Sequence, residues 1–575
     1  MDKKFASSLL LNLIQRIDLG QIAAFTALER AALVYAQKAL GEDDTSATAD
    51  PQEPVLKPAG TASVPAPQAE PEVAPTPRHA LPEVKLNLTA IERDTPSDPD
   101  VLLCLDFGTA MSKAFAFVQP AGYIDLDLGR AAGGRGYPVP SSVFIGTDGK
   151  AYFGFEAITQ SDGLAANGRE RLDSFKTWLS LGSGGDLDSE ARTLKSSQNP
   201  VGGGLTQGDA IRMYLAYLTD LATNCLGDNQ GAPNRKTAGR YVLRRFARPS
   251  WPDQKQADWA DEQMKRYLSE AQVLADTFSG RWAGGIQVMQ LKAAIEQIKQ
   301  RGARPRYLID IGVPEPVAVA AGAVSASENF RDFYLVVDAG AGTTDFGFFF
   351  SGHALDGQTK VFQVSSSIHG LMHHAGNRVD ELLRNVIRRR HAIEGSSPEA
   401  ESIERGMREQ SRAWKELLFR DGKVDYMLVT GDGGTIDRKD FLADGAVQEF
   451  GRALEAGLRK SLEALDDTYL AQLAHDPVRL NVLVTGGSAP LPMVRSLADG
   501  VIEIKGFKIM RQLAEAMPEW MAGKPREFVD AYLQLAVAIG GAADELPEAK
   551  VGPDQFPGTG GRAQYVAGRL QVSGS

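Results

Sequence analysis

The chain has 575 residues, a formal net charge of -11 at pH 7 and 43% hydrophobic residues. This length and composition suit a soluble globular protein with room for several domains or two large lobes. The acidic balance argues against a general nucleic-acid binder, and no apolar run approaches the roughly 18 to 20 residues that a membrane span requires.

Residues 1–42 carry apolar side chains at helical spacing in two sets separated by Gly20, which predicts a pair of short amphipathic helices. Their apolar stripe predicts either packing on the rest of the chain or docking of a protein partner, and the spacing favours neither. Polar residues interrupt the apolar patch near the start, which argues against a secretory signal. Because the two cysteines, Cys104 and Cys225, are far apart and suit a reducing compartment, we expect a cytoplasmic protein.

Residues 43–100 are rich in Pro and Ala, and prolines at this density disfavour a packed fold. We therefore expect a disordered linker. Within it, only Val84–Ile91 alternates apolar and polar residues well enough to be a possible added strand.

The folded body begins at Val101, where VLLCLDFGTAMSKAFAF predicts a strand, a tight acidic turn and a second strand. The same pattern returns in LVVDAGAGTTDFGFF from Leu335, and a third Gly-rich turn, LVTGGSAPLPMV, begins at Leu483. One such turn alone would be an ordinary hairpin, but the repeat favours two hairpins that hold phosphates from opposite sides. Asp106 and Asp338 would then project into the gap, where two carboxylates suffice for Mg²⁺.

Other elements follow from helical and strand periodicity. Helices are predicted at Leu172–Leu181, Thr206–Leu226, Asn377–Arg390, Glu401–Phe419 and Phe528–Ala543, within Asp253–Gly302 and within Asp437–Leu473, and strands at Tyr241–Ala247, Tyr307–Ile311 and Leu480–Thr485. Thr206 and Asp437 are the candidate N-caps of their helices.

In order and spacing, the three turns resemble the phosphate-1, phosphate-2 and adenosine motifs of the superfamily of actins, sugar kinases and DnaK-type heat-shock chaperones. Residues 313–324 and 533–543 resemble its two connecting helices. The resemblance implies an α/β, two-lobed actin-like ATPase fold of duplicated ribonuclease-H-like domains, here with an N-terminal helical extension. It implies lobe I at 101–325 with an inserted helix near 286–300, lobe II at 326–546 and a disordered tail at 547–575.

The DnaK-type branch fits best, because Glu315 in Pro-Glu-Pro matches its catalytic glutamate and Lys176 in SFKTWL matches its lysine near the γ-phosphate. The resemblance implies a slow Mg²⁺-dependent ATPase that binds ATP and ADP. It implies catalytic roles for Lys176, Glu315, Asp345 and Thr343, and a Mg²⁺ site at Asp106 and Asp338. Its nucleotide-binding positions are Gly108, Thr109, Lys113, Gly340, Gly342, Thr344, Lys415, Gly486, Gly487 and Ser488.

The sequence also departs from the chaperone pattern. Lys113 matches a basic phosphate contact of actins and sugar kinases, so either it or Lys176 could contact the γ-phosphate, and Arg412 replaces an expected acidic residue near the ribose. The short segment after Gly541 predicts no built-in client-peptide domain.

We therefore expect a nucleotide-driven conformational switch for a protein partner, which could dock on the N-terminal helices. One alternative is a small-molecule kinase of the sugar-kinase type, favoured by Lys113. Another is an actin-like filament or scaffold protein.

Overall fold

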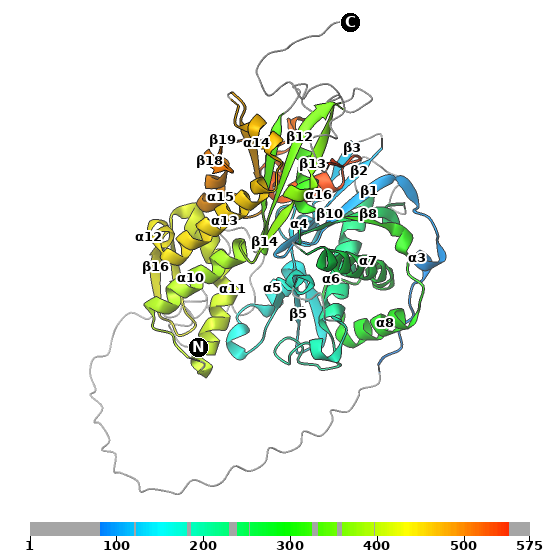
Figure 1. The fold of residues 1–575 in the computed structure, drawn as a ribbon. Coiled ribbons are helices and arrows are strands. Elements are labelled where there is room, and N and C mark those ends of the chain that lie inside the picture. The colour runs from blue at the N-terminus through cyan, green and yellow to red at the C-terminus, as the bar shows by residue number, and fades with distance from the viewer. Residues whose placement is uncertain are drawn as a thin grey trace, which may run out of the picture.

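The computed structural model describes residues 81–550 except 120–121, 181–185, 229–237, 252, 325–331, 354–358, 396 and 476. These residues form a mixed α/β structure, so the predicted α/β class is confirmed. Two large sheets organise the molecule (Figure 1), one within residues 98–314 and the other within residues 333–550. The predicted N-terminal helical pair lies outside the described residues.

The first sheet combines an antiparallel hairpin with two parallel strands. Its strands are β1 (Asp98–Asp106), β2 (Met111–Val118), β3 (Gly122–Asp125), β8 (Val242–Arg248) and β10 (Ile309–Pro314), with β4 (Val139–Pro140) paired to β2. Their order is β10-β8-β1-β2-β3, in which β8 and β10 run parallel to β1. The apolar run at the end of β1 is buried on both faces, as expected for a central strand.

The second sheet repeats this arrangement. Its strands are β11 (Phe333–Ala339), β12 (Thr343–His353), β13 (Thr359–Val364), β14 (His369–Met372), β17 (Leu480–Thr485), β18 (Gly500–Ile504), β19 (Phe507–Leu513) and β20 (Glu548–Lys550). The order β19-β17-β11-β12-β13 matches β10-β8-β1-β2-β3 in both sequence of neighbours and strand direction. The β1–β2 and β11–β12 hairpins therefore take equivalent places in their sheets.

Smaller elements surround the two sheets. The minor strands are β5 (Ser142–Ile145), β6 (Lys150–Phe153), β7 (Leu172–Asp173), β9 (Ile286–Gln287), β15 (Lys423–Met427) and β16 (Gly433–Asp437). The helices are α3 (Thr89–Glu92), α4 (Leu128–Ala131), α5 (Gly154–Ser161), α6 (Gln207–Asp228), α7 (Gln254–Thr277), α8 (Val288–Gln300), α9 (Glu315–Ala323), α10 (Gly376–Arg390), α11 (Pro398–Asp421), α12 (Arg438–Ala443), α13 (Gly445–Glu463), α14 (Asp467–Leu473), α15 (Pro492–Arg495) and α16 (Arg526–Gly541).

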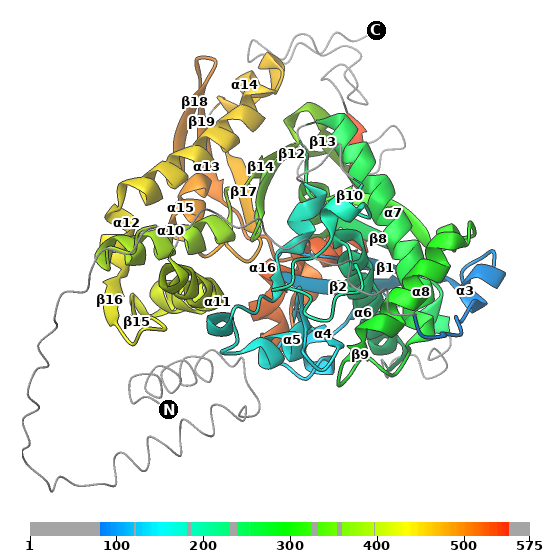
Figure 2. The ribbon, with the colours of Figure 1, turned by 90° about the horizontal axis from the view of Figure 1, so that it is seen from below.

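Three apolar cores hold these elements together. The first sheet packs with α6, α7 and α8, and the second with α10, α11 and α13. The third core lies between the sheets around α9 and α16, and Figure 2 shows α16 in the middle of the molecule. These two helices pack closely, since a Cβ on Gly540 would lie 1.6 Å from the carbonyl oxygen of Ala318. Small residues are therefore required where α9 crosses α16.

Local signals placed several helices correctly. The Thr206 hydroxyl accepts from the N–H of Asp209 over 3.2 Å, while the Asp209 carboxylate accepts from the N–H of Thr206 over 3.1 Å. This reciprocal pair caps α6 as predicted. Asp437 accepts from the N–H of Lys439 and caps α12, which is also as predicted. The helix expected near residues 286–300 corresponds to α8.

Two predicted elements were wrong. Val84–Ile91 is not a strand, because residues 81–88 have no sheet partner and α3 begins at Thr89. The alternation reflects one-sided burial against helices, with Leu86 only 9% exposed and the carbonyl of Val84 accepting from Gln297 over 2.9 Å. The helix expected at Leu172–Leu181 is instead β7 followed by a short 3₁₀ helix, η2 (Phe175–Leu179).

The predicted disordered tail also begins differently. Residues 548–550 form β20, which extends the second sheet by pairing in parallel with β13. The chain from residue 551 onward lies outside the described residues.

In the first sheet, the strand expected at Tyr307–Ile311 corresponds to the edge strand β10. It begins only at Ile309, after a 3₁₀ turn.

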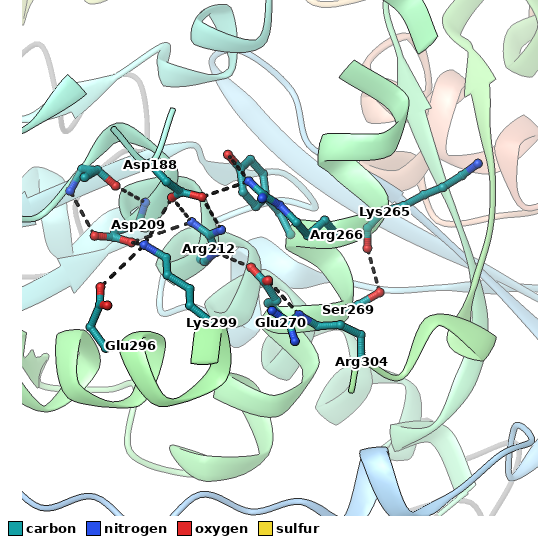
Figure 3. A network of polar contacts seen from close by, with 12 residues as sticks. Asp188, Asp209, Arg212, Lys265, Arg266, Ser269, Glu270, Glu296, Lys299 and Arg304 are labelled. Atoms are coloured by element: carbon teal, nitrogen blue, oxygen red, sulfur yellow. Dashed lines mark hydrogen bonds and ion pairs between the residues drawn. The ribbon is translucent and has the colours of Figure 1, made fainter. Parts of the chain in front are cut away.

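A network of buried charges joins α6, α7, α8 and the chain around Asp188 (Figure 3). The Arg212 side chain is 1% exposed and donates to Asp188 over 2.7 Å, and it also bonds to Glu270. Lys299 of α8 reaches Asp209 over 2.7 Å. Because each of these carboxylates meets a cation, the network compensates its own charge and fixes α8 to the first core.

No helix among the described residues is long and apolar enough to span a membrane.

Candidate functional site

The turn between β1 and β2 places Asp106 at the end of a buried strand. Asp106 is 3% exposed and lies directly opposite Lys113 in the hairpin, and the two side chains form an ion pair of 3.0 Å. The turn requires glycine at position 108, since a Cβ on Gly108 would lie 2.0 Å from the carbonyl oxygen of Met111. The Ser141 hydroxyl donates to the Gly108 carbonyl over 2.6 Å and supports the turn from outside.

The turn between β11 and β12 has the same form but a different charge. Asp338 is 4% exposed, and the residue directly opposite it is Asp345, which is fully buried. Directly opposite residues share one face of a hairpin, so both carboxylates lie on the same side. Alternation along the strand puts Thr343 on that face and Thr344 on the other, where its hydroxyl donates to the carbonyl of His374 over 2.7 Å.

These two turns face each other at close range. A Cβ on Gly342 would lie 2.7 Å from the hydroxyl oxygen of Thr109, so the second turn has no room for a larger residue there. The N–H of Gly340 donates to the carbonyl of Thr343 over 2.9 Å, which keeps the second turn tight. The two Gly-rich acidic turns therefore form opposite walls of one narrow space.

The third Gly-rich turn closes this space from the side of the second sheet. The N–H of Ser488 donates to the carbonyl of Ala339 over 2.9 Å, and its hydroxyl donates to the carbonyl of Gly340 over 2.7 Å. Gly486 has a φ of 90°, and a Cβ on it would lie 2.3 Å from the carbonyl oxygen of Ala339, so only glycine fits. All three predicted turns are thus brought together.

A buried ion pair completes the space from the first sheet. Lys176, on η2, donates to Glu315, the first residue of α9, over 3.0 Å, and the two side chains are 8% and 9% exposed. Burial disfavours the charged lysine, but Glu315 and Asp106 outweigh burial and raise the pKa of Lys176. The lysine is therefore a firmly charged group inside the site.

The site holds more acidic than basic side chains. Asp106, Glu315, Asp338 and Asp345 lie around Lys113 and Lys176, and Arg248, which pairs with Asp261, also interacts with Asp345 and Glu315. Burial, and then the charge of Glu315, raise the pKa of Asp338 and of Asp345.

The space between the turns is a small cavity of about 90 Å³. Of the predicted residues, it is lined by Asp106, Gly108, Thr109, Lys113, Lys176, Glu315, Asp338, Gly340, Gly342, Thr343, Gly486 and Gly487. Thr344 and Asp345 do not line it: Thr344 points to the opposite face, and Asp345 accepts a hydrogen bond from the N–H of Ser250.

A wider cavity of about 950 Å³ adjoins the small one, and the two share six wall residues: Ala110, Met111, Gly340, Ala341, Gly487 and Gln534. Ser488 and Lys415 line this wider cavity, and Lys415 donates to the carbonyl of Gly376 over 3.0 Å and pairs with Asp380 at 2.9 Å. Apart from Thr344, the predicted nucleotide residues are therefore divided between two adjoining cavities.

Several lining residues were missed by sequence reasoning. Gln534 of α16 lines both cavities, and the wider cavity is also lined by Arg171, Asp173, Asn377 and Glu416. No sequence motif marks these positions. Only the packing of distant segments brings them to the cavity. For Gln534 alone there was a weak signal, because it is the one polar residue in the apolar, small-residue segment 533–543.

The donor set fits a divalent cation only together with other ligands. Among the described residues, no group of three or more His, Cys, Asp or Glu side chains could hold a metal ion. Asp106 and Asp338 both line the small cavity, however, and Mg²⁺ needs only one or two carboxylates when phosphate oxygens and waters supply the rest. A cation there would also offset the repulsion from Glu315 that helps to raise the pKa of Asp338.

Neither a scan of protein-family models nor a search of curated proteins finds a match to this chain.

Proposed function

We propose that this protein binds Mg-ATP between the two acidic turns and hydrolyses it slowly. The observation that carries the proposal is the contact between the two turns, where Gly342 has no room for a Cβ beside Thr109. Two hairpins in this arrangement offer backbone N–H groups to phosphates from opposite sides. The adjoining wide cavity, with Ser488 and Lys415 on its wall, would take the nucleoside.

The fold supports this proposal. The same five-strand order occurs in both sheets, and each copy places an acidic turn at the end of its central strand. A duplication of this kind is what a two-lobed, actin-like fold of duplicated ribonuclease-H-like domains predicts. Among its branches, the Lys176–Glu315 pair favours a protein that resembles the nucleotide-binding domain of DnaK-type chaperones.

Charge and position give each residue of the site a role. When bound with the nucleotide, Mg²⁺ would offset phosphate charge, and Asp106 and Asp338 would hold it. Lys176 would stabilise the γ-phosphate as negative charge develops on it. Glu315 and Asp345 would orient a water molecule, whose oxygen attacks the γ-phosphorus while the bond to the β–γ bridging oxygen breaks.

The output of the cycle would be a change in the angle between the two sheets, at the crossing of α9 and α16. These helices fill the core between the sheets and meet through Gly540 and Gly322. A protein partner would sense this change, and residues 1–42 offer one surface for it.

The test is ATP binding and turnover by the purified full chain. Wild type should bind ATP and release phosphate slowly, whereas Asp106→Ala should weaken Mg-ATP binding. Glu315→Gln should bind nucleotide but lose about 100-fold in turnover. Glu449→Gln, an exposed glutamate on α13, is the matched control and should behave as wild type. Failure of wild type to bind any adenine nucleotide would refute the proposal.

One observation favours a second candidate, a small-molecule kinase. The wide cavity has a volume of about 950 Å³, at the upper end of the usual range for ligand sites, so it offers room for an acceptor beside a nucleoside. Such a kinase would release little phosphate with ATP alone. Incubation with ATP and a panel of sugars and polyols, followed by detection of phosphorylated product, separates the two functions.

A further inference from the structure

Ser250 lies beside Asp345, one of the two carboxylates assigned to the attacking water, although no sequence motif marks it. It follows β8 and Pro249, and it is 4% exposed. β8 and β10 are parallel neighbours in which Arg248 pairs with Pro314. Ser250 and Glu315, which directly follows Pro314, therefore both lie just beyond the C-terminal ends of these neighbouring strands.

The backbone of Ser250 is also fixed to Asp345 of the second sheet. Its N–H donates to Oδ1 of Asp345 over 2.6 Å. Gly370 of β14 closes this contact, because a Cβ there would lie 2.1 Å from the carbonyl oxygen of Ser250 and 3.0 Å from Oδ1 of Asp345. The chain that follows β8 is therefore fixed against Asp345 of the second sheet.

Two polar atoms at this contact have hydrogen-bonding capacity left over. Oγ of Ser250 and Oδ2 of Asp345 are buried, and neither makes a hydrogen bond of 3.5 Å or less to any residue that the structure describes. Buried polar side-chain atoms in folded proteins usually have a partner. A hydroxyl can donate one bond and accept two, so it suits a water molecule that a carboxylate also holds.

We propose that the Ser250 hydroxyl, together with Oδ2 of Asp345, holds the water molecule that attacks the γ-phosphate. This inference rests on the proposed ATPase function. The water oxygen forms the bond to the γ-phosphorus, the bond to the β–γ bridging oxygen breaks, and one water proton passes to Asp345. Ser250 orients the water and keeps its own proton, so it acts on the chemical step and not on nucleotide affinity.

The first test is steady-state ATP turnover by full-length Ser250→Ala. Its kcat should fall about ten-fold while KM stays within about two-fold, because only the water has lost a partner. Ser250→Cys keeps a similar shape with a weaker hydrogen-bonding group, so its kcat should lie between those of wild type and Ser250→Ala. Ser269→Ala is the matched control: Ser269 is buried on α7, its hydroxyl donates to the carbonyl of Lys265, and its loss should leave kcat unchanged.

A double-mutant cycle tests the shared water. In an Asp345→Asn background, Ser250→Ala should lower kcat less than two-fold, since the water is already displaced. An equal fall in both backgrounds, or an unchanged kcat in Ser250→Ala with active wild type, would overturn the inference alone. If Ser250→Ala does not fold, an unchanged kcat in Ser250→Cys overturns it. Absence of turnover in wild type would instead refute the proposed function.

Discussion

The β1–β2 and β11–β12 hairpins take equivalent places in their sheets but balance their charge differently. In the first, Asp106 faces Lys113 across the hairpin in an ion pair of 3.0 Å. In the second, Asp338 faces Asp345 and accepts a hydrogen bond of 2.9 Å from Thr485. The first hairpin is therefore neutralised within the protein, whereas the second holds paired carboxylates that a bound cation would stabilise. The same strand arrangement thus gives one hairpin whose charge is balanced within the protein and one whose charge a bound cation would balance.

Neutralising Asp106 and Asp338 in turn should produce the largest difference between the two hairpins. Asp106→Asn should lower the free energy of unfolding by about 4 kcal/mol, because it leaves the charge of Lys113 without its partner in a largely buried site. Asp338→Asn should raise it by about 1 kcal/mol at pH 8, because it removes one of two facing carboxylates. Urea unfolding without nucleotide or Mg²⁺ measures both values.

The gain from Asp338→Asn should depend on pH. Folding raises the pKa of Asp338, so its ionised form costs stability at pH 8, and this cost disappears as pH falls below the ordinary pKa of an aspartate. The variant and wild type should therefore converge near pH 4. Equal destabilisation by both substitutions at pH 8 would contradict the difference between the hairpins.

The helical layers that cover the two sheets offer a second comparison. Arg212→Leu should lower the free energy of unfolding by about 3 kcal/mol, because its carboxylate partners are buried with it. Arg384→Leu in α10 should cost only about 1 kcal/mol, since Arg384 lies 3.6 Å from Glu404 at a more exposed site. Thermal and urea unfolding measure both changes in free energy. Similar losses of stability would show that the ion network of Figure 3 stabilises the protein no more than the ion pair of Arg384 does.

The same network predicts a pH dependence. Arg212, Lys299 and Arg266 outweigh burial and lower the pKa of Asp188 to about 2. A carboxyl with a lowered folded-state pKa stabilises the protein above its ordinary pKa and loses that effect as pH falls toward 2. Asp188→Asn should therefore cost about 2 kcal/mol at pH 7 and about 1 kcal/mol at pH 3. A cost that does not change with pH would mean that packing, and not charge, explains it.

The smallest expected effect concerns Thr485. Thr485→Val removes the hydroxyl that donates to Asp338 while keeping the shape of the side chain, and it should cost about 1 kcal/mol at pH 8. Because this hydrogen bond lowers the pKa of Asp338, its loss should also weaken Mg²⁺-dependent nucleotide binding at neutral pH. Unchanged unfolding and binding would indicate that the hydroxyl does not support the carboxylate.

The elements closest to the site could be predicted because their signals are local. Turn glycines, acidic residues at strand ends and the capping residues Thr206 and Asp437 act within a few positions along the chain. The small-residue pattern of α9 and α16 likewise marked helices that pack closely.

Features that depend on tertiary packing could not be predicted. Of two adjacent threonines, only Thr343 faces the cavity, because a strand turns successive side chains to opposite faces and the register was unknown. Gln534 reaches the cavity, and Ser250 reaches Asp345, only through contacts between distant segments. The alternation at Val84–Ile91 correctly indicated that one side of this segment is buried. It did not indicate that helices, and not a sheet, cover that side.

The most direct test of the central claim is calorimetric titration of ATP into wild type and Asp338→Asn, each with and without Mg²⁺. If a bound cation balances the carboxylates of the second hairpin, wild type should bind ATP at least about ten-fold more tightly with Mg²⁺ than without it. Asp338→Asn should lose most of this difference. Equal ATP affinity of wild type with and without Mg²⁺, or a full Mg²⁺ effect in Asp338→Asn, would contradict the account.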